Sequence, residues 1–302
     1  MRLCYVPKRF SQGTAETISL AVDIIEEYEG QGYTLTLRQL YYQFVSRDLI
    51  PNSLRAYKRL GQIVNDGRLA GEISWYSIED RTRNLSALSH WTSPADIIRS
   101  AARGFRIDKW KGQTFRVEVW IEKEALAGVF QRVCEEEDVP FFSCRGYVSQ
   151  SEMWSAAQRM AGYHEDGQTP LILHFGDHDP SGIDMTRDIL ERLELFEGFP
   201  EVERLALNMD QVTEFSPPPN PAKVTDSRFE GYLRRYGGES WELDALEPSV
   251  LSGLVRSRIH AARDPDLWEE KIEVERGHLS MLNKVSRSWA EVESFLAELG
   301  NE

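Results

Sequence analysis

Three features are scarce in this 302-residue chain: cysteine, long apolar runs and net positive charge. Its three cysteines, Cys4, Cys134 and Cys144, have neither metal-ligand nor paired spacing. This predicts a protein of a reducing compartment, in which the cysteines serve as small apolar side chains that fill space. No apolar stretch reaches membrane-spanning length, and the first ten residues lack the apolar core of a secretory signal. We therefore expect a cytoplasmic protein with no membrane partner.

The net charge of −14 argues against a nucleic-acid binder until it is divided along the chain. Residues 1–112 carry a net charge of +4, whereas residues 113–302 carry −18. A basic front half joined to an acidic back half is typical of a DNA-contacting module attached to a metal-dependent one, although acidic surfaces are also common on soluble proteins. With 41% apolar residues, the chain is long enough for two domains with their own cores.

The central motif is LILHFGDHDPSGIDM, from Leu171 to Met185. Its apolar start predicts a buried strand, which Gly176 and the Pro-Ser-Gly turn end before a helix. Residues two apart on an extended chain point the same way, so Asp177 and Asp179 can face one point while the histidine between them faces away. Two carboxylates this close raise each other's pKa unless a cation lies between them, and Mg²⁺ meets that need.

A third carboxylate, Glu122, follows the alternating strand Phe115–Ile121 where strand gives way to helix. In an open α/β sheet ligands bind outside the carboxyl ends of the strands, which predicts that Glu122 joins Asp177 and Asp179 around one magnesium ion. Each acid alone is more often a solvated residue or a helix cap, because Asp and Glu are enriched at helix N-termini. The joint pattern favours the metal site.

The N-terminal part predicts three helices. In LRQLYYQF the apolar residues share one helical face that includes Tyr41, whereas Tyr42 lies off that face with Arg38 four residues before it. We therefore expect Tyr42 and Arg38 side by side on an exposed surface. The third helix, Ser53–Leu69, carries a polar and mostly basic row opposite its apolar side, formed by Arg55, Lys58, Arg59 and Gln62.

The segment GEISWYSI after the third helix can form a β wing, and three helices with a wing predict a winged helix-turn-helix that binds DNA through the basic row. The alternative is a solvated helix with basic residues. The charged stretch Ile78–Arg83 is an ion-paired corner or a phosphate contact, and the sequence does not separate the two. Pro94–Gly112 is expected to be a basic connector.

A Glu at the end of one strand and a DxD at the end of a later one resemble the Toprim domain. IEKEALAGVF and FGDHDPSGIDM resemble the VEK(D/E)AVF and DxDPxG stretches of topoisomerase VI A subunits and their meiotic double-strand-break relatives. LRQLYYQF resembles their R(D/E)(I/L)(F/Y)Y stretch and WELDALEP their ELEAL segment, whereas CRGYVSQSEMW lacks the usual GYPD form. The likeness covers roughly Thr34 to Leu246.

The resemblance implies an α/β protein in four parts. An N-terminal winged-helix domain is expected in residues 1–93, a basic connector in 94–112, a Toprim domain with a largely parallel sheet in 113–247 and a C-terminal helical extension in 248–302.

The resemblance also implies the roles of single residues. Tyr42 would be the nucleophile and Arg38 its partner, while Glu122, Asp177 and Asp179 would hold Mg²⁺. In the family the tyrosine of one subunit meets the metal site of the other, which implies a homodimer. Lys123, for phosphate, and Asp184, for support of the metal ligands, are second-rank candidates that could equally be surface residues.

The expected activity is a magnesium-dependent break in double-stranded DNA that leaves a 5′-phosphotyrosyl link. One alternative is a Toprim nuclease that uses metal-activated water, and another is a non-catalytic DNA-binding or bridging protein. The chain has no Gly-rich ATP loop, so it looks most like the stand-alone "mini-A" relatives of mobile elements and phages. An ATPase or other regulatory partner is left open, and full strand passage by this chain alone is not expected.

Overall fold

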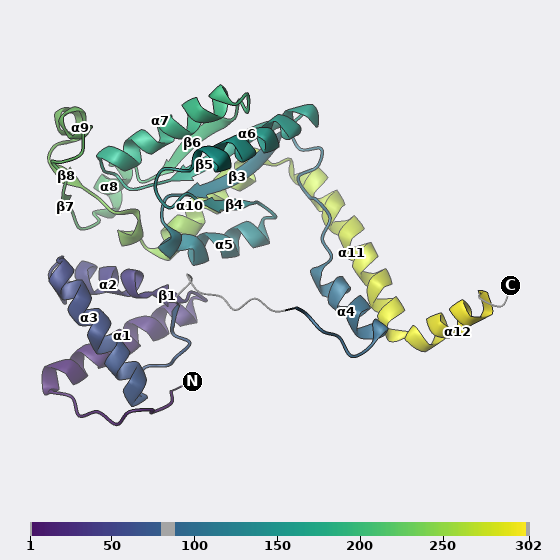
Figure 1. The fold of residues 1–302 in the computed structure, drawn as a ribbon, viewed down its shortest axis with the longest axis horizontal. Helices are drawn as coiled ribbons and strands as arrows, with labels where there is room; N and C mark the ends of the chain where they lie inside the picture. Colours follow the sequence, from purple (N-terminus) through teal and green to yellow (C-terminus); the bar gives the residue numbers. More distant parts are fainter. Residues whose placement is uncertain (1, 80–87, 300–302) are drawn as a thin grey trace. The chain divides into compact units, whose positions relative to one another are not determined.

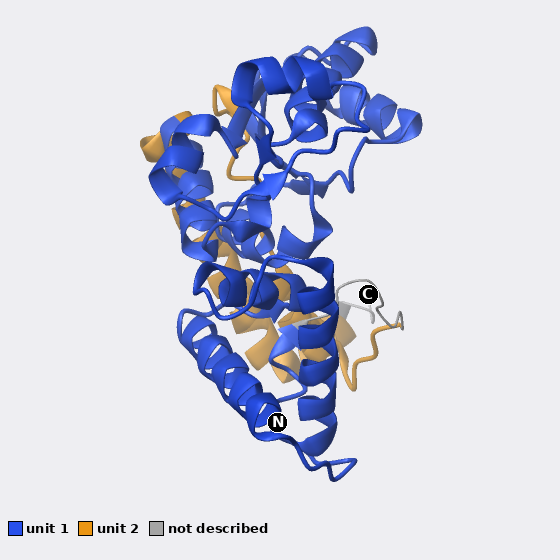
Figure 2. Cartoon of the chain, turned by 90° about the vertical axis from the view of Figure 1, so that its left-hand side faces the viewer, with its two compact units in different colours: residues 1–83, 116–261 blue, residues 84–115, 262–302 orange. Residues whose placement is uncertain are grey.

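The computed structural model describes residues 2–79 and 88–299, and in these residues the protein is of the α/β class. The described part holds twelve α-helices, a four-stranded parallel sheet and two pairs of two-residue strands. The chain forms two compact units: unit 1 is Met1–Arg83 with Arg116–Ala261, and unit 2 is Asn84–Phe115 with Ala262–Glu302 (Figure 2). Within the described ranges, no helix combines the length and apolar character needed to cross a bilayer.

A parallel sheet with the strand order β4-β3-β5-β6 forms the centre of unit 1 (Figure 1). Its strands are β3 (Phe115–Ile121), β4 (Phe141–Ser143), β5 (Thr169–Phe175) and β6 (Glu201–Ala206). The chain runs from β3 to β4 on one side, crosses back over β3 to β5, and continues to β6 on the other side. The direction of winding therefore reverses between β3 and β5, and the predicted α/β class with a parallel sheet is confirmed.

Helices cover both faces of this sheet (Figure 1). The crossovers are α5 (Ala127–Glu136), α6 (Gln150–Glu165) and α7 (Pro180–Leu195), and α10 (Pro248–Ala262) follows later in the chain. On one face, Trp120 and Ile172 pack in a core with residues of α6 and α7. On the other face, the rings of Phe130 in α5 and Phe175 in β5 lie 4.7 Å apart. Alternate strand residues thus meet different helices, as expected for a sheet buried on both sides.

The remaining elements of unit 1 after β6 are short. They are α8 (Met209–Phe215), β7 (Asn220–Pro221), α9 (Phe229–Tyr236), β8 (Glu239–Ser240) and the 3₁₀ turn η2 (Leu243–Ala245), which precede α10. Another 3₁₀ turn, η1 (Glu124–Leu126), lies between β3 and α5. The strands β7 and β8 form an antiparallel pair. This segment returns the chain to the turn after β5, where the backbone of His178 pairs with that of Trp241.

Three helices with their own core form the N-terminal part of unit 1, as predicted. They are α1 (Gln12–Gly30), α2 (Leu37–Ser46) and α3 (Leu54–Ala70). The expected wing is not seen: after Gly71 the described residues form turns and then β2 (Ile78–Glu79), which pairs in parallel with β1 (Leu35–Thr36). Most of the charged stretch 78–83 lies outside the described residues.

The start of α2 is fixed by a reciprocal cap. The Thr36 hydroxyl accepts from the N–H of Gln39 at 3.3 Å, and the Gln39 side chain accepts from the N–H of Thr36 at 2.8 Å. We expect Thr36→Ala to lower the free energy of unfolding by about 1 kcal/mol, because one N–H loses its partner. Thr36→Ser keeps the hydroxyl and is the matched control. Urea unfolding followed by circular dichroism measures both, and equal stability of the two variants would contradict this role.

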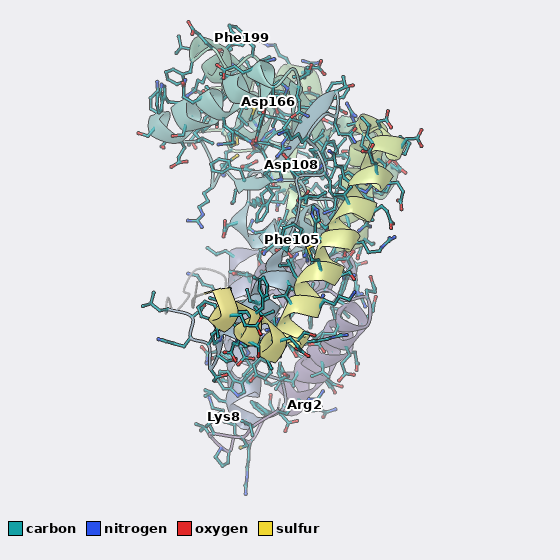
Figure 3. The ribbon with its side chains drawn as sticks, turned by 90° about the vertical axis from the view of Figure 1, so that its right-hand side faces the viewer. Arg2, Lys8, Phe105, Asp108, Asp166 and Phe199 are labelled. Carbon is teal, nitrogen blue, oxygen red and sulfur yellow. The ribbon has the colours of Figure 1, made fainter. Side chains whose placement is uncertain are left out.

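Unit 2 is built on a pair of packed helices. These are α4 (Pro94–Gly104) and α11 (Pro265–Arg287), and α12 (Trp289–Leu299) follows them. Trp110 stacks edge-on against Trp268, and Phe105 lies against α11 with its ring 5.7 Å from that of His278 (Figure 3). The expected connector 94–112 is therefore a helix and loop that pack on α11, rather than a separate linker.

Candidate functional site

The ends of β3 and β5 bring Glu122 next to the turn that follows β5. Oε2 of Glu122 accepts a hydrogen bond from the N–H of Asp177 at 2.8 Å, and the N–H of Glu122 donates to the carbonyl of Phe175 at 2.8 Å. In sheets of this kind, the crevice at the carboxyl ends opens where the winding direction reverses, which here is between β3 and β5. The structure thus places Glu122 and Asp177 together at the point where such folds bind ligands.

Two glycines lie against the Glu122 carboxylate. A Cβ on Gly182 would lie 2.3 Å from the carbonyl oxygen of Asp177 and 3.1 Å from Oε2 of Glu122. A Cβ on Gly176 would lie 2.9 Å from the same Oε2. Backbone therefore requires glycine at position 182, whereas a side chain at position 176 would displace the Glu122 carboxylate.

Asp179 serves as the N-cap of α7. Its Oδ1 accepts from the N–H of Gly182 at 2.6 Å and from the hydroxyl of Ser181 at 3.0 Å. The alternative considered for Asp179, that it caps a helix, is thus confirmed as part of its role. Asp179 remains partly exposed, and the turn that holds it also donates the Asp177 N–H to Glu122.

Asp177 is turned toward a lysine. Its Oδ2 lies 2.8 Å from Nζ of Lys123, and its Oδ1 accepts from the N–H of Leu243 at 2.8 Å. Burial raises the pKa of Asp177 well above its usual range, and the lysine acts against that rise. Lys123, a second-rank candidate from the sequence, is therefore the cation closest to the aspartate pair.

His178, between the two aspartates, faces away from them, as predicted. Its Nδ1 lies 2.7 Å from the hydroxyl of Tyr232, and its ring packs edge-on against Tyr236 and Trp241. Burial lowers the pKa of His178 to about 4, so the ring is neutral near pH 7. It anchors the turn and takes no part in holding a cation.

Two acids that the sequence analysis did not propose as site residues, Glu242 and Asp244, complete the surroundings of Lys123. Nζ of Lys123 lies 3.2 Å from Asp244 and also contacts Glu242. Arg38 reaches the same pair, with Nε 2.5 Å from Asp244 and Nη2 2.9 Å from Glu242. In the sequence, the WELDAL segment stands out only by its resemblance to the family segment. The spacing of Glu242 and Asp244, two residues apart like Asp177 and Asp179, is the sequence signal that could have indicated them.

Arg204 in β6 is a further residue that the sequence did not reveal. Its guanidinium donates to the carbonyls of Gly176 at 2.9 Å, Asp177 at 2.6 Å and Gly182 at 2.8 Å. Burial lowers the pKa of Arg204 to about 10, so it stays charged. The Arg204 side chain therefore links three carbonyls of the turn and places a positive charge close to Glu122, Asp177 and Asp179.

Tyr42 is not exposed, contrary to the prediction: its exposed fraction is 5%, the same as that of Tyr41. The helical count correctly identified the face of α2 that meets the N-terminal core, but η2 packs on α2 as well. The Arg38 guanidinium lies 5.8 Å from the centre of the Tyr42 ring. Burial, with Asp244 and Glu242, raises the pKa of the Tyr42 phenol.

A hollow of about 260 Å³ lies beside Tyr42. Its lining includes Arg38, Tyr41, Tyr57 and Glu242. The Tyr42 ring is therefore linked to the acids through Arg38 within a single chain. The expectation that it serves the site of a second subunit stays a prediction.

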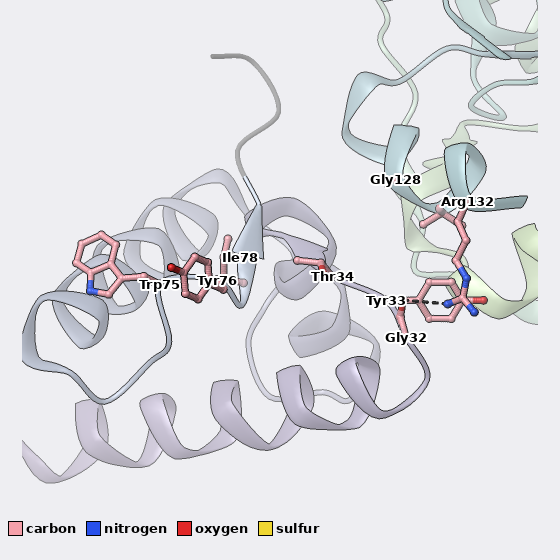
Figure 4. Close-up of a pocket in the computed structure, with 9 residues that line it drawn as sticks. Gly32, Tyr33, Thr34, Trp75, Tyr76, Ile78, Gly128 and Arg132 are labelled. Atoms are coloured by element: carbon pink, nitrogen blue, oxygen red, sulfur yellow. Dashed lines mark hydrogen bonds between the residues drawn. The ribbon is translucent and has the colours of Figure 1, made fainter. Parts of the chain in front are cut away.

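The structure places the other predicted residues apart from this cluster. Arg55, Lys58, Arg59 and Gln62 form an exposed row on α3. Asp184 contacts Tyr147 at 2.8 Å, Arg187 at 2.8 Å and Arg228 at 2.9 Å rather than the candidate metal ligands. In a separate hollow of about 480 Å³, Arg132 covers the ring of Tyr33 (Figure 4). The described residues that line this hollow include no carboxylate, so it differs chemically from the acidic cluster.

The fit of these residues to a metal ion rests on donor type and charge. In residues 2–79 and 88–299, no three His, Cys, Asp or Glu side chains are already arranged to hold a metal ion. At the candidate site Asp177 is paired with Lys123 instead. The donors are nevertheless hard oxygens, which Mg²⁺ prefers. Five carboxyl groups and three cations gather here, a formal excess of two negative charges when every carboxyl group is counted as ionised, and one divalent ion would balance it. Burial raises the pKa of Glu122 and Asp177, and a bound cation would offset that rise. The groups are Glu122, Asp177, Asp179, Glu242 and Asp244 against Arg38, Lys123 and Arg204.

Comparison with known proteins adds no assignment. No family model matches the chain, and no curated protein matches it.

Proposed function

We propose that this protein binds double-stranded DNA and breaks it in a magnesium-dependent reaction at the Glu122–Asp177 crevice. The supporting observation is that Glu122 and the aspartate turn meet at the reversal point of a parallel sheet, with more acids than cations around them. In this proposal residues 113–247 act as a Toprim domain, and α1 to α3 act as the DNA-binding domain through the exposed row on α3.

Glu122, Asp177 and Asp179 would hold the ion, which when bound supplies positive charge where negative charge develops on the phosphate. Asp177 becomes available when Lys123 moves toward Glu242 and Asp244, both of which it already contacts. Lys123 and Arg38 would add charge beside the phosphate. Asp177 would thus exchange the Lys123 ammonium for the magnesium ion.

Tyr42 is the proposed nucleophile. Its Oη would form a bond to phosphorus while the bond from phosphorus to the 3′ oxygen breaks; the phenol proton is lost and the 3′ oxygen gains one. The product is a 5′-phosphotyrosyl link and a 3′ hydroxyl. Arg38, which lies over the Tyr42 ring, would stabilise the phenolate. A second subunit and a regulatory or ATPase partner remain part of the proposal.

Hydrolysis by water is the second candidate, and the burial of Tyr42 favours it. A phenol with an exposed fraction of 5% must be uncovered before it can attack, whereas water reaches a partly exposed Asp179 directly. This route predicts free 5′ phosphates and no protein–DNA adduct.

The test is to incubate labelled duplex DNA with the protein and Mg²⁺, denature the mixture and ask whether label stays on the protein. We expect Tyr42→Phe to abolish the adduct, Tyr41→Phe to retain it and chelation of the metal to prevent it. Cutting that survives Tyr42→Phe, yields free 5′ phosphates and is lost in Asp177→Asn would select the nuclease. Binding without cleavage under Mg²⁺ or Mn²⁺, weakened by Arg55→Ala with Arg59→Ala, would overturn both and leave a DNA-binding protein.

A further inference from the structure

One face of α11 carries three exposed apolar side chains at intervals of seven residues. Leu267, Val274 and Met281 have exposed fractions of 37%, 43% and 64%. Seven-residue spacing is the repeat by which one helix keeps a continuous seam against another. Different positions of α11 face the rest of unit 2: Ser286 bonds to Ala95 of α4, and Trp268 packs against Trp110 in the loop after α4, so the seam is not part of the core of unit 2.

The charge of α11 divides at its middle. Pro265–Glu275 holds five acidic residues and one lysine, whereas residues 276–287 hold three basic residues and no acidic one. Two copies lying side by side in the same direction would place like charges together. Two copies lying in opposite directions would place each acidic half against a basic half.

The row beside the seam shows the same symmetry at single positions. Glu270, Gly277 and Lys284 are also seven residues apart, and all three are exposed. Gly277 lies inside the helix, where glycine is unfavourable, and a Cβ there would meet nothing within the chain. In an antiparallel pair centred on Gly277, the bare backbones of the two copies meet at this glycine, and each Glu270 faces a Lys284.

We propose that α11 binds a second copy of itself in an antiparallel, two-fold arrangement along the seam Leu267–Val274–Met281. The 23 residues of α11 make the contact long enough for several turns of each helix. Two further apolar side chains, Phe295 and Leu296, are exposed on the following helix. This inference concerns unit 2 and does not depend on the DNA chemistry proposed for unit 1.

Charge exchange in the full chain tests the orientation as well as the contact. Sedimentation equilibrium is expected to show a dimer for the wild type. Glu270→Lys and Lys284→Glu should each raise the dissociation constant about tenfold or more, because both symmetric contacts become repulsive. The double variant E270K/K284E should return to the wild-type value. An equimolar mixture of the two single variants should form a heterodimer, since every contact across it is attractive again.

A wild type that stays monomeric would overturn the proposal, as would a dimer that neither single variant weakens. The same variants distinguish parallel pairing, in which Glu270 would face Glu270 and Glu270→Lys would not weaken the dimer. Circular dichroism of each variant checks that the helix content is unchanged. Val274→Asp, which removes the centre of the seam without altering the Glu270–Lys284 contacts, should also give a monomer, and a dimer in that variant would contradict the seam.

Discussion

Gly182→Ala is expected to lower the free energy of unfolding by about 3 kcal/mol or more, because the added methyl would lie 2.3 Å from the carbonyl oxygen of Asp177. The obstacle is backbone, so no side-chain rotation relieves it. The turn must open, which also disturbs the Gly182 N–H bond to Asp179 and the Gly182 carbonyl bond to Arg204. Urea unfolding monitored by tryptophan fluorescence measures the loss.

Gly162→Ala in α6 is the matched control. A Cβ at Gly162 meets nothing within 4 Å, and alanine favours helix over glycine by about 1 kcal/mol. We therefore expect opposite signs for the same chemical change at two glycines of unit 1. If Gly182→Ala changed stability by less than about 1 kcal/mol, the turn would be far more pliable than its contacts indicate.

Lys123→Met is expected to lower the free energy of unfolding by about 3 kcal/mol, because it leaves Asp177 buried without its cation and Asp244 with Arg38 alone. The Lys123 side chain is 15% exposed and that of Asp244 is 0% exposed, so water replaces little of the lost interaction. Although burial disfavours its charge, Asp244, Asp177 and Glu242 together raise the pKa of Lys123, which indicates how strongly the cluster requires it. Thermal and urea unfolding at pH 7 measure the effect.

Two further variants show whether this loss arises from the carboxylates. Adding Asp177→Asn to Lys123→Met should recover part of the stability, since the amide oxygen can still accept from the N–H of Leu243. Arg145→Met, which breaks a surface pair with Glu124, should cost less than about 1 kcal/mol. A double variant less stable than Lys123→Met alone would show that Asp177 is held by something other than the lysine.

The strands and their ends were accessible to sequence reasoning because their signals are local. An apolar run followed by Gly176 and a Pro-Ser-Gly turn specifies where β5 stops, and alternation specifies β3. The carboxyl ends of adjacent parallel strands then bring Glu122 and Asp177 together without further information. The outward direction of His178 follows from the same two-residue period.

The partners of Lys123 and the burial of Tyr42 were beyond such reasoning, because they depend on a segment far along the chain. Helical periodicity predicts which side of α2 is apolar. It does not predict that η2, which lies about 200 residues later, covers the other side. The same is true of Arg204, whose position follows from the pairing of β6 with β5. The basic residues of Pro94–Gly112 favour a connector, and the sequence of this segment alone does not reveal its packing on α11.

The contact between α2 and η2 also bears on how the protein is made. α2 ends at Ser46 and η2 begins at Leu243, and a ribosome adding ~5–20 residues per second needs roughly 10–40 s to produce the stretch between them. For that interval the nascent chain carries Tyr42 and its neighbours without their cover. Slow translation would lengthen this exposure, and a chaperone bound to α2 would shield its apolar side chains until η2 is made.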